Sequence, residues 1–251
     1  MRKVLSFLMI LSFLFSPFHT HYAKNDQTIN QIEEIASFEY DVTGDGVMEK
    51  MILRGSYLSE NSSFYHDIWL DVTSEYTDKW KISFASGYEP KLQFIHLTND
   101  EIADLFYSVR KTEKKTPMVH QLYSLRNGKV TQLPLPKVNR MSGLLRDHFL
   151  ASVAIDSSEK ALTIDLSKVK HTLIDRSLYD SSGKLQQQTK IFVQPISVLQ
   201  PILLSKNKGY GLKSIQYVTI EQTDVIVGAV ESIWYFEQDN WVRLKTNYKQ
   251  R

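Results

Sequence analysis

The chain has 251 residues, of which 42% are hydrophobic and 23% are charged, as in an ordinary folded globular protein. These fractions exclude a wholly disordered, collagen-like or low-complexity chain. The absence of cysteine excludes disulfides, thiolate catalysis and cysteine-ligated zinc or iron–sulfur clusters.

Residues 1–23 have the pattern of an export signal. Arg2 and Lys3 form a positive end, residues 4–18 carry no charge, and Ala23 suits the last position before a cleavage site. The apolar stretch is shorter than the roughly 20 residues that span a bilayer, so we expect no stable membrane span after cleavage. An uncleaved N-terminal anchor is the alternative. The expected location is outside the cell or at the cell envelope, and an exported chain without cysteine favours a bacterial source.

Cleavage after Ala23 would remove Arg2 and Lys3 from the 30 basic residues and leave 28 basic against 28 acidic residues. A neutral chain with interspersed charges argues against a nucleic-acid partner, because nucleic acid is bound by a net basic face. The dense basic run at residues 111–115 is therefore interpreted as a solvated loop.

Residues 24–37 are polar, with isoleucine at positions 29, 32 and 35, which predicts a short amphipathic helix or a loose arm. From Phe38 onward, alternating hydrophobicity and turn residues every eight to twelve positions predict strands. No Gly/Ser-rich or Pro-rich linker divides residues 38–251, so they are predicted to form one β-repeat domain. Short helices are expected only at residues 142–149 and around residues 198–204. Strands are expected at residues 51–53, 68–72, 80–84, 162–166 and 215–220.

Two spacings in the chain indicate internal repetition. Tyr123, Tyr179 and Tyr235 are evenly spaced, and each lies near a turn signal, which is Asn127-Gly128, Ser182-Gly183 or Asp239-Asn240. Residues 38–49 also align with residues 93–104 at an offset of 55. A period of this size is about one four-stranded β unit. The predicted fold is all-β and mostly antiparallel, with a propeller-like repeat of about 55 residues and few short helices; a β-sandwich is the alternative.

The segment 41–49 places oxygen-bearing residues at alternate positions around two glycines that allow a sharp bend. Alternate carboxylates in a tight turn converge on one point, and Ca²⁺ takes about six to eight oxygen ligands. We therefore predict a structural calcium site. An EF-hand is excluded, because its closing glutamate would fall at Ile52. The alternative is a turn whose Asp side chains cap their own backbone. The predicted ligands are Asp41, Thr43, Asp45, Val47 and Glu49.

This loop, followed directly by a strand, resembles the calcium-binding repeats of integrin-type (FG-GAP) and VCBS proteins. That resemblance is specific around Asp41, is weaker over residues 93–107, and implies a β-propeller blade. The second copy keeps Thr98, Asp100 and Asp104, but His96 replaces the first aspartate, which weakens the prediction of a cation there. The layout also resembles uncharacterised exported proteins of Bacillus type.

No Ser-nucleophile elbow, phosphate loop, dinucleotide-binding glycine pattern or zinc-binding His pair occurs in the sequence. The sequence therefore favours a non-catalytic exported β module that binds a protein or an envelope glycan. The alternatives are a secreted hydrolase with a carboxylate-based site and a structural envelope or spore-associated protein. The four tryptophans, which are expected in the core, are the candidates for a sugar-binding surface: Trp69, Trp80, Trp234 and Trp241.

Overall fold

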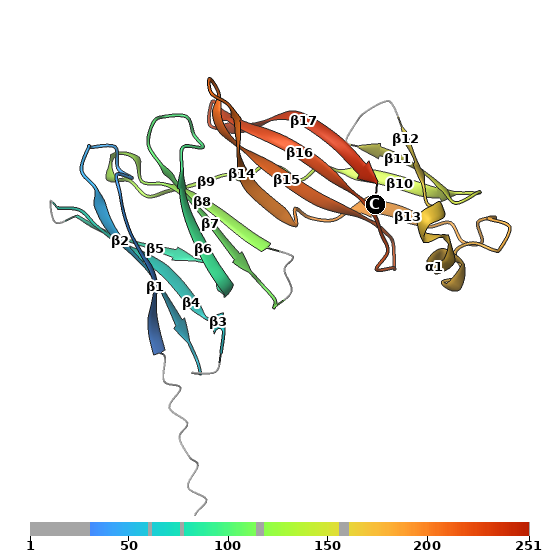
Figure 1. Ribbon diagram of the computed structural model, residues 1–251, viewed down its shortest axis with the longest axis horizontal. Coiled ribbons are helices and arrows are strands. Elements are labelled where there is room, and N and C mark those ends of the chain that lie inside the picture. Colours follow the sequence, from blue (N-terminus) through green and yellow to red (C-terminus); the bar gives the residue numbers. More distant parts are fainter. Residues whose placement is uncertain (1–30, 60–61, 76–77, 114–117, 156–160, 251) are drawn as a thin grey trace, which may run out of the picture.

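The computed structural model describes residues 31–59, 62–75, 78–113, 118–155 and 161–250. The described part of the chain is an all-β, antiparallel structure with three sheets and one short α-helix. Figure 1 shows two halves side by side: strands β1–β9 form the N-terminal half, and strands β10–β17 form the C-terminal half. The predicted all-β, antiparallel class is therefore confirmed.

The N-terminal half contains two sheets, called sheet A and sheet B. Sheet A has the order β1-β2-β4-β5 and sheet B has the order β3-β6-β7-β8-β9. The strands of sheet A are β1 (Gln31–Tyr40), β2 (Glu49–Tyr57), β4 (Asp67–Thr73) and β5 (Lys79–Phe84). The strands of sheet B are β3 (Phe64–Tyr65), β6 (Gly87–Ile95), β7 (Asp104–Arg110), β8 (Met118–Ser124) and β9 (Thr131–Leu133).

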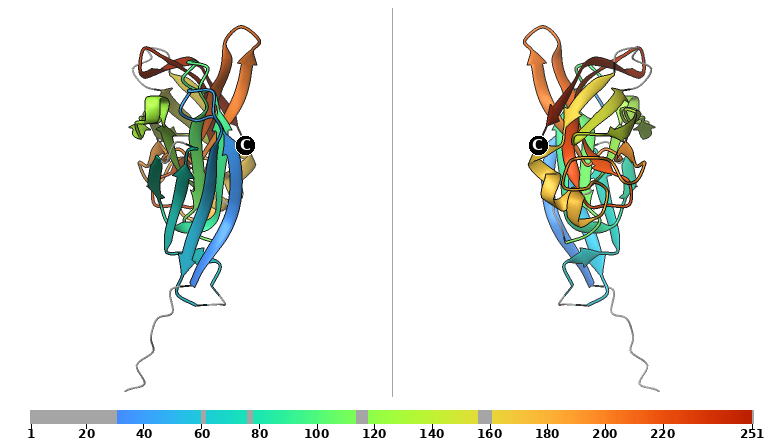
Figure 2. Two further views of the ribbon diagram at one scale, coloured as in Figure 1. Left: turned by 90° about the vertical axis from the view of Figure 1, so that its left-hand side faces the viewer. Right: turned by 90° about the vertical axis from the view of Figure 1, so that its right-hand side faces the viewer.

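Sheets A and B pack face to face as a β-sandwich, called here the N-terminal sandwich. Apolar residues at alternate positions of β2, such as Met51 and Leu53, point into a core shared with β6, β7 and β8. The rings of Phe84 and Tyr107 stack across this core with centroids 4.3 Å apart. Figure 2 (left) views this half from its outer end, where many of its antiparallel strands lie along nearly the same axis.

The C-terminal half is built on one eight-stranded sheet, sheet C. Its order is β12-β11-β10-β13-β15-β16-β17, and β14 also pairs with β15. The strands are β10 (Met141–Arg146), β11 (Leu150–Ile155), β12 (Leu162–Asp165), β13 (Lys190–Val193), β14 (Val198–Ser205), β15 (Gly209–Ile220), β16 (Ile226–Glu237) and β17 (Asn240–Gln250). The helix α1 (Lys170–Asp175) follows β12 after a short 3₁₀ turn (Ser167–Val169).

Sheet C curls into a nearly closed barrel around its own core. Gln250, at the end of β17, donates from Nε2 to the backbone oxygen of Asp165, at the end of β12, over 2.6 Å. The two outermost strands of the sheet therefore approach each other at one end. Inside lies a core that includes Leu145, Tyr179 and Val218, and Leu173 of α1 packs into it.

A third core joins the two halves. Phe106 and Leu122 of sheet B pack with Leu212 and Trp234 of sheet C. Strand β7 is buried on both of its faces as a result, because its other face belongs to the core of the N-terminal sandwich. Such two-sided burial explains why Leu105, Phe106 and Tyr107 of β7 are apolar in succession instead of alternating with polar residues.

Two successive groups of four strands share one antiparallel order. Strands β1, β2, β4 and β5 form one unit, and β6, β7, β8 and β9 form the next in the same antiparallel order. The hairpin β1–β2 maps onto β6–β7 at the offset seen in the sequence. The two units pack as a sandwich, and the described strands do not form a ring of blades, so the propeller is not shown.

Several predicted elements are corrected by the structure. Residues 31–37 of the expected helix or arm belong to β1, where pairing with β2 and a bulge between Glu34 and Ala36 override the spacing of the isoleucines. Residues 142–149 form β10 and its hairpin turn. Residues 198–204 lie in β14, which tolerates Pro201 because its only strand partner among the described residues is β15. The five expected strands are all present.

The three evenly spaced tyrosines do not occupy equivalent positions. Tyr123 lies in β8 and Tyr235 in β16, whereas Tyr179 forms an isolated bridge with Leu185 after α1. The turn between β16 and β17 centres on Gln238 and Asp239, one residue earlier than expected. The tyrosine spacing therefore does not mark a structural unit.

The expected signal at residues 1–23 lies outside the described residues, as do Lys114 and Lys115 of the basic run at residues 111–115. Within the described residues, no helix has both the length and the apolar character required to cross a membrane.

Candidate metal centre

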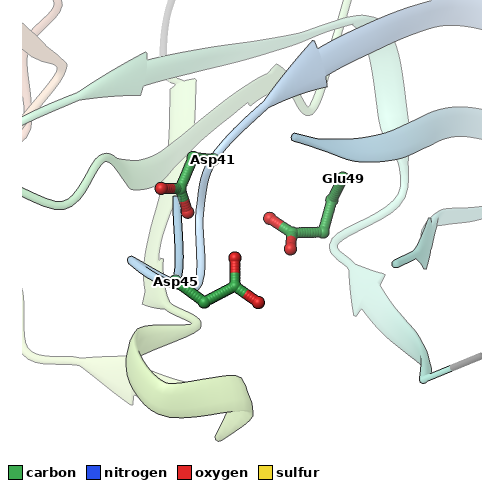
Figure 3. Close-up of side chains that lie close together, drawn as sticks. All are labelled: Asp41, Asp45 and Glu49. Atoms are coloured by element: carbon green, nitrogen blue, oxygen red, sulfur yellow. The ribbon is translucent and has the colours of Figure 1, made fainter. Parts of the chain in front are cut away.

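The candidate metal centre lies in the loop between β1 and β2, called here the acidic loop (residues 41–49). The hairpin places Asp41 directly after β1 and Glu49 at the first position of β2. One oxygen from each of Asp41, Asp45 and Glu49 lies within 4.8 Å of the others. Figure 3 shows these three side chains gathered around one space, with Asp45 and Glu49 facing each other. The structure therefore brings together the three predicted carboxylates.

The backbone of the acidic loop is held by its own carboxylates. Asp41 accepts hydrogen bonds from the backbone nitrogens of Gly44, at 2.6 Å, and Gly46, at 2.9 Å. Asp45 accepts one from the backbone nitrogen of Val47, at 2.9 Å. Gly44 and Gly46 have φ values of +82° and +87°, which only glycine adopts without strain.

Glu49 is fully buried and anchors the base of the loop. Its Oε2 accepts from the backbone nitrogen of Val42 at 2.9 Å, and its Oε1 accepts from the hydroxyl of Thr43 at 3.1 Å. The backbone oxygen of Thr43 accepts from the backbone nitrogen of Asn127 at 3.0 Å. Thr43 thus meets the centre through its hydroxyl, whereas Val47 contacts Asp45 through its N–H group.

The three carboxylates have no basic partner among the described residues. None of the ion pairs in this part of the chain involves Asp41, Asp45 or Glu49. Bringing three negative charges this close is unfavourable unless a cation or protons compensate them. The hydrogen bonds hold the backbone of the acidic loop in its conformation. The concentration of negative charge suits a hard divalent cation.

The second loop, residues 96–104 between β6 and β7, shares part of this hydrogen-bond scheme. Asp104 accepts from the backbone nitrogen of Leu97 and from the hydroxyl of Thr98, as Glu49 does from Val42 and Thr43. Asp100 accepts from the backbone nitrogen of Ile102, as Asp45 does from Val47. Here the guanidinium of Arg126 lies 3.4 Å from Asp100, so this loop has its own cationic partner.

Burial raises the pKa of Asp104 to about 6, although the hydrogen bonds from Thr98 and Leu97 act in the opposite direction. Desolvation of the charged form therefore outweighs the donors that favour it.

The two loops pack against each other, which the sequence pattern did not predict. A Cβ atom on Gly44 would lie 2.5 Å from Cδ1 of Ile102, so the absence of a side chain at Gly44 allows this approach. Asn127, one of the residues of the η1 turn (Arg126–Gly128), fixes the other side of the acidic loop.

The tryptophans do not form a common surface. Trp80 donates to the backbone oxygen of Gly128, Trp234 donates to the hydroxyl of Ser214, and Trp241 donates to the backbone oxygen of Pro134. Trp69 lies on the other face of sheet A, with the ammonium of Lys81 4.5 Å from its ring centre. They therefore belong to three separate regions of the fold.

His120 and Asp104, whose pKa values are strongly shifted, lie apart from four grooves of the described surface. His120 is buried against Phe106 with both ring nitrogens unpaired, and desolvation lowers its pKa to about 4. Neither His120 nor Asp104 lines any of four described grooves. An enzyme site commonly gathers such groups in a cleft.

Comparisons with known proteins find a family model that matches the C-terminal half of the chain. Residues 139–249 match the family model of the YybI C-terminal domain. The chain is 22% identical over 219 residues to the uncharacterized protein YybI of Bacillus subtilis, and the match covers 82% of this chain and 81% of that protein. No solved structure matches the chain. These matches give no support to the FG-GAP or VCBS resemblance. The chain is therefore similar to YybI over most of its length, and its residues 139–249 are similar to the YybI C-terminal domain.

Proposed function

We propose that the protein is an exported, non-catalytic β module in which the acidic loop binds a structural Ca²⁺ ion and the surface binds a cell-envelope glycan or protein. The observation that carries the calcium half is the convergence of Asp41, Asp45 and Glu49 within 4.8 Å without a basic partner in the described chain. Carboxylate and hydroxyl oxygens are the ligands that Ca²⁺ prefers.

The position of the loop supports a bracing role for the ion. The acidic loop contacts the second loop through Gly44 and the η1 turn through Thr43. An ion bound there would tie the β1–β2 hairpin of sheet A to elements of sheet B. Calcium would then stabilise the N-terminal sandwich, because a ligand that binds only the folded state raises its stability.

Thermal unfolding in the presence and absence of Ca²⁺ tests this proposal. We expect millimolar Ca²⁺ to raise the melting temperature of the wild-type protein, with about 2.7 kcal/mol of stabilisation at a hundredfold excess over Kd. Asp45→Asn removes one exposed carboxylate charge while keeping an acceptor for Val47, and this variant should lose the response.

Asp100→Asn is the matched control, because Asp100 occupies the equivalent position of the second loop. It should respond to Ca²⁺ as the wild type does. The same melting temperature for the wild type with Ca²⁺ and with a chelator would refute the calcium half of the proposal, and the acidic loop would then be a self-capped turn.

A further inference from the structure

A groove in the C-terminal half lies between residues 134–140, called here the strap, and strands β16 and β17. The strap connects β9 to β10 and therefore joins the two halves of the molecule. The groove has a volume of about 640 Å³, and its lining includes Lys137, Val138 and Arg140 from the strap and Trp241 and Arg243 from β17. This volume falls in the range of about 300–1,000 Å³ found for small-ligand sites.

Hydrogen bonds hold the walls of this groove in place. The indole nitrogen of Trp241 donates to the backbone oxygen of Pro134 over 2.7 Å, and Arg243 donates to Oδ1 of Asn139 over 2.5 Å. Asn139 is only 1% exposed and donates from Nδ2 to Gln216 and Ser232 of the sheet. The groove is therefore held in shape before any ligand arrives, which lowers the entropic cost of binding.

The charges on the groove have one sign. Lys137, Arg140 and Arg243 line it, and no Asp or Glu is among the described residues of its lining. Guanidinium groups hold carboxylate and phosphate groups through paired hydrogen bonds. The groove is thus complementary to an anion, in contrast to the acidic loop.

The rest of the groove lining is apolar and includes the indole rings of two tryptophans. Trp241 is half-buried, and Val138 is 51% exposed at the rim. Trp234 is nearly buried beneath Arg243, whose guanidinium carbon lies 5.8 Å from its ring centre. Trp241 is therefore the indole that can meet a ligand ring, because its polar edge is already bonded to the strap.

We propose that this groove binds an anionic glycan, with a carboxylate or phosphate group held by Lys137, Arg140 and Arg243 and a sugar ring lying on Trp241. The indole of Trp241 is held by its hydrogen bond to the strap, and Arg243 lines the same groove. This arrangement suits a sugar ring that carries an acid group. This inference rests on the binding half of the proposed function and is independent of the calcium half.

Titration calorimetry with four probes on the full exported protein tests the inference. Trigalacturonic acid carries carboxylates, phosphorylated maltotriose carries phosphate, maltotriose is neutral, and hexaglutamate is an acidic peptide. We expect binding of at least one acidic sugar, weaker binding at high salt, and at least tenfold weaker binding of maltotriose. The comparison of the two acidic sugars distinguishes the carboxylate source from the phosphate source.

Val138→Glu places an acid at the exposed rim without removing any hydrogen bond of the strap. It should weaken binding of the acidic sugar at least tenfold, while Val138→Thr and Lys245→Ala, on β17 outside the groove lining, should leave it unchanged. A melting temperature equal to that of the wild type shows that the variant folds. Tighter binding of hexaglutamate, no binding of either acidic sugar at millimolar concentration, or no effect of Val138→Glu would overturn the inference, and none of these results bears on calcium binding.

Discussion

Glu49 and Asp104 occupy equivalent positions in two successive copies of one loop. Each begins a strand, each is buried, and each accepts from the backbone nitrogen seven residues earlier and from a threonine hydroxyl six residues earlier. The loop conformation therefore depends on this shared set of hydrogen bonds, whether or not an ion is bound. The loops differ in charge, because the second loop has His96 where the first has Asp41.

Alanine substitutions at Gly44 and Gly46 distinguish two contributions to stability, which are the backbone conformation of the acidic loop and its contact with Ile102. Both have positive φ, but a Cβ on Gly44 would also lie 2.5 Å from Ile102, whereas a Cβ on Gly46 would meet no atom within 4 Å. We expect Gly46→Ala to cost about 1 kcal/mol and Gly44→Ala about 2–3 kcal/mol of unfolding free energy. Urea unfolding measures both, and equal losses would show that the contact between the loops contributes nothing.

His120 should make the protein less stable in acid. Burial lowers its pKa from 6.5 to about 4, so between these values the unfolded chain binds a proton that the folded protein excludes. The stability linked to His120 is present above about pH 6.5 and is lost as the pH falls toward 4. His120→Leu should remove about 3 kcal/mol of this pH dependence. Urea unfolding at pH 7 and pH 4.5 measures it, and an NMR titration that gives His120 an ordinary pKa would contradict the explanation.

Asp104 should act in the opposite direction over nearly the same range. Its pKa rises from 3.8 to about 6 on folding, so the folded protein holds a proton that the unfolded chain has released. This contribution is present below about pH 4 and is lost as the pH rises through 6. Asp104→Asn should therefore gain stability relative to the wild type between pH 4 and pH 7, by about 3 kcal/mol. A constant difference across that range would show that Asp104 titrates normally.

Asn139 should be among the most sensitive polar positions in the protein. Its side chain donates to Gln216 and Ser232 and accepts from Arg243, all within the interface of the strap with sheet C. Asn139→Ala leaves these partners without their bonds and should cost about 2–4 kcal/mol. Asn247→Ala, at a position of β17 outside this interface, is the control and should cost less than about 0.5 kcal/mol. Chemical denaturation measures both variants.

Export predicts a defined N-terminus for the mature protein. Mass spectrometry of the secreted fraction should find a chain that begins at Lys24, because Ala23 is the predicted last residue of the signal. An intact Met1 in that fraction would show that the signal is not cleaved there.

The sequence predicted the parts of the fold that depend on local pattern. Alternation identified strands such as 68–72 and 215–220, and the shared residues of the two loops identified the repeating unit. It failed where pairing overrides local preference. The isoleucine spacing of residues 29–35 suggested a helix, but residues 31–37 are held in β1 by β2, and a bulge shifts the alternation of side chains.

Of the candidate site, only the gathering of its three carboxylates was predictable from the sequence. The order of Asp41, Asp45 and Glu49 along the chain indicates that a tight turn brings them together. Nothing local reveals that Ile102 packs on Gly44 or that Asn127 bonds to Thr43, because these contacts join segments that are far apart in the sequence. The groove beside the strap depends on the same kind of distant contact.

The third core has a consequence for any chain that consists of the C-terminal matched region alone. Leu212 and Trp234 lie within the matched region, but they are covered by Phe106 and Leu122, which precede it. A chain that began near residue 139 would leave this apolar surface open to water. Such a protein must supply a substitute cover, from another domain or a partner, or it will be prone to aggregate.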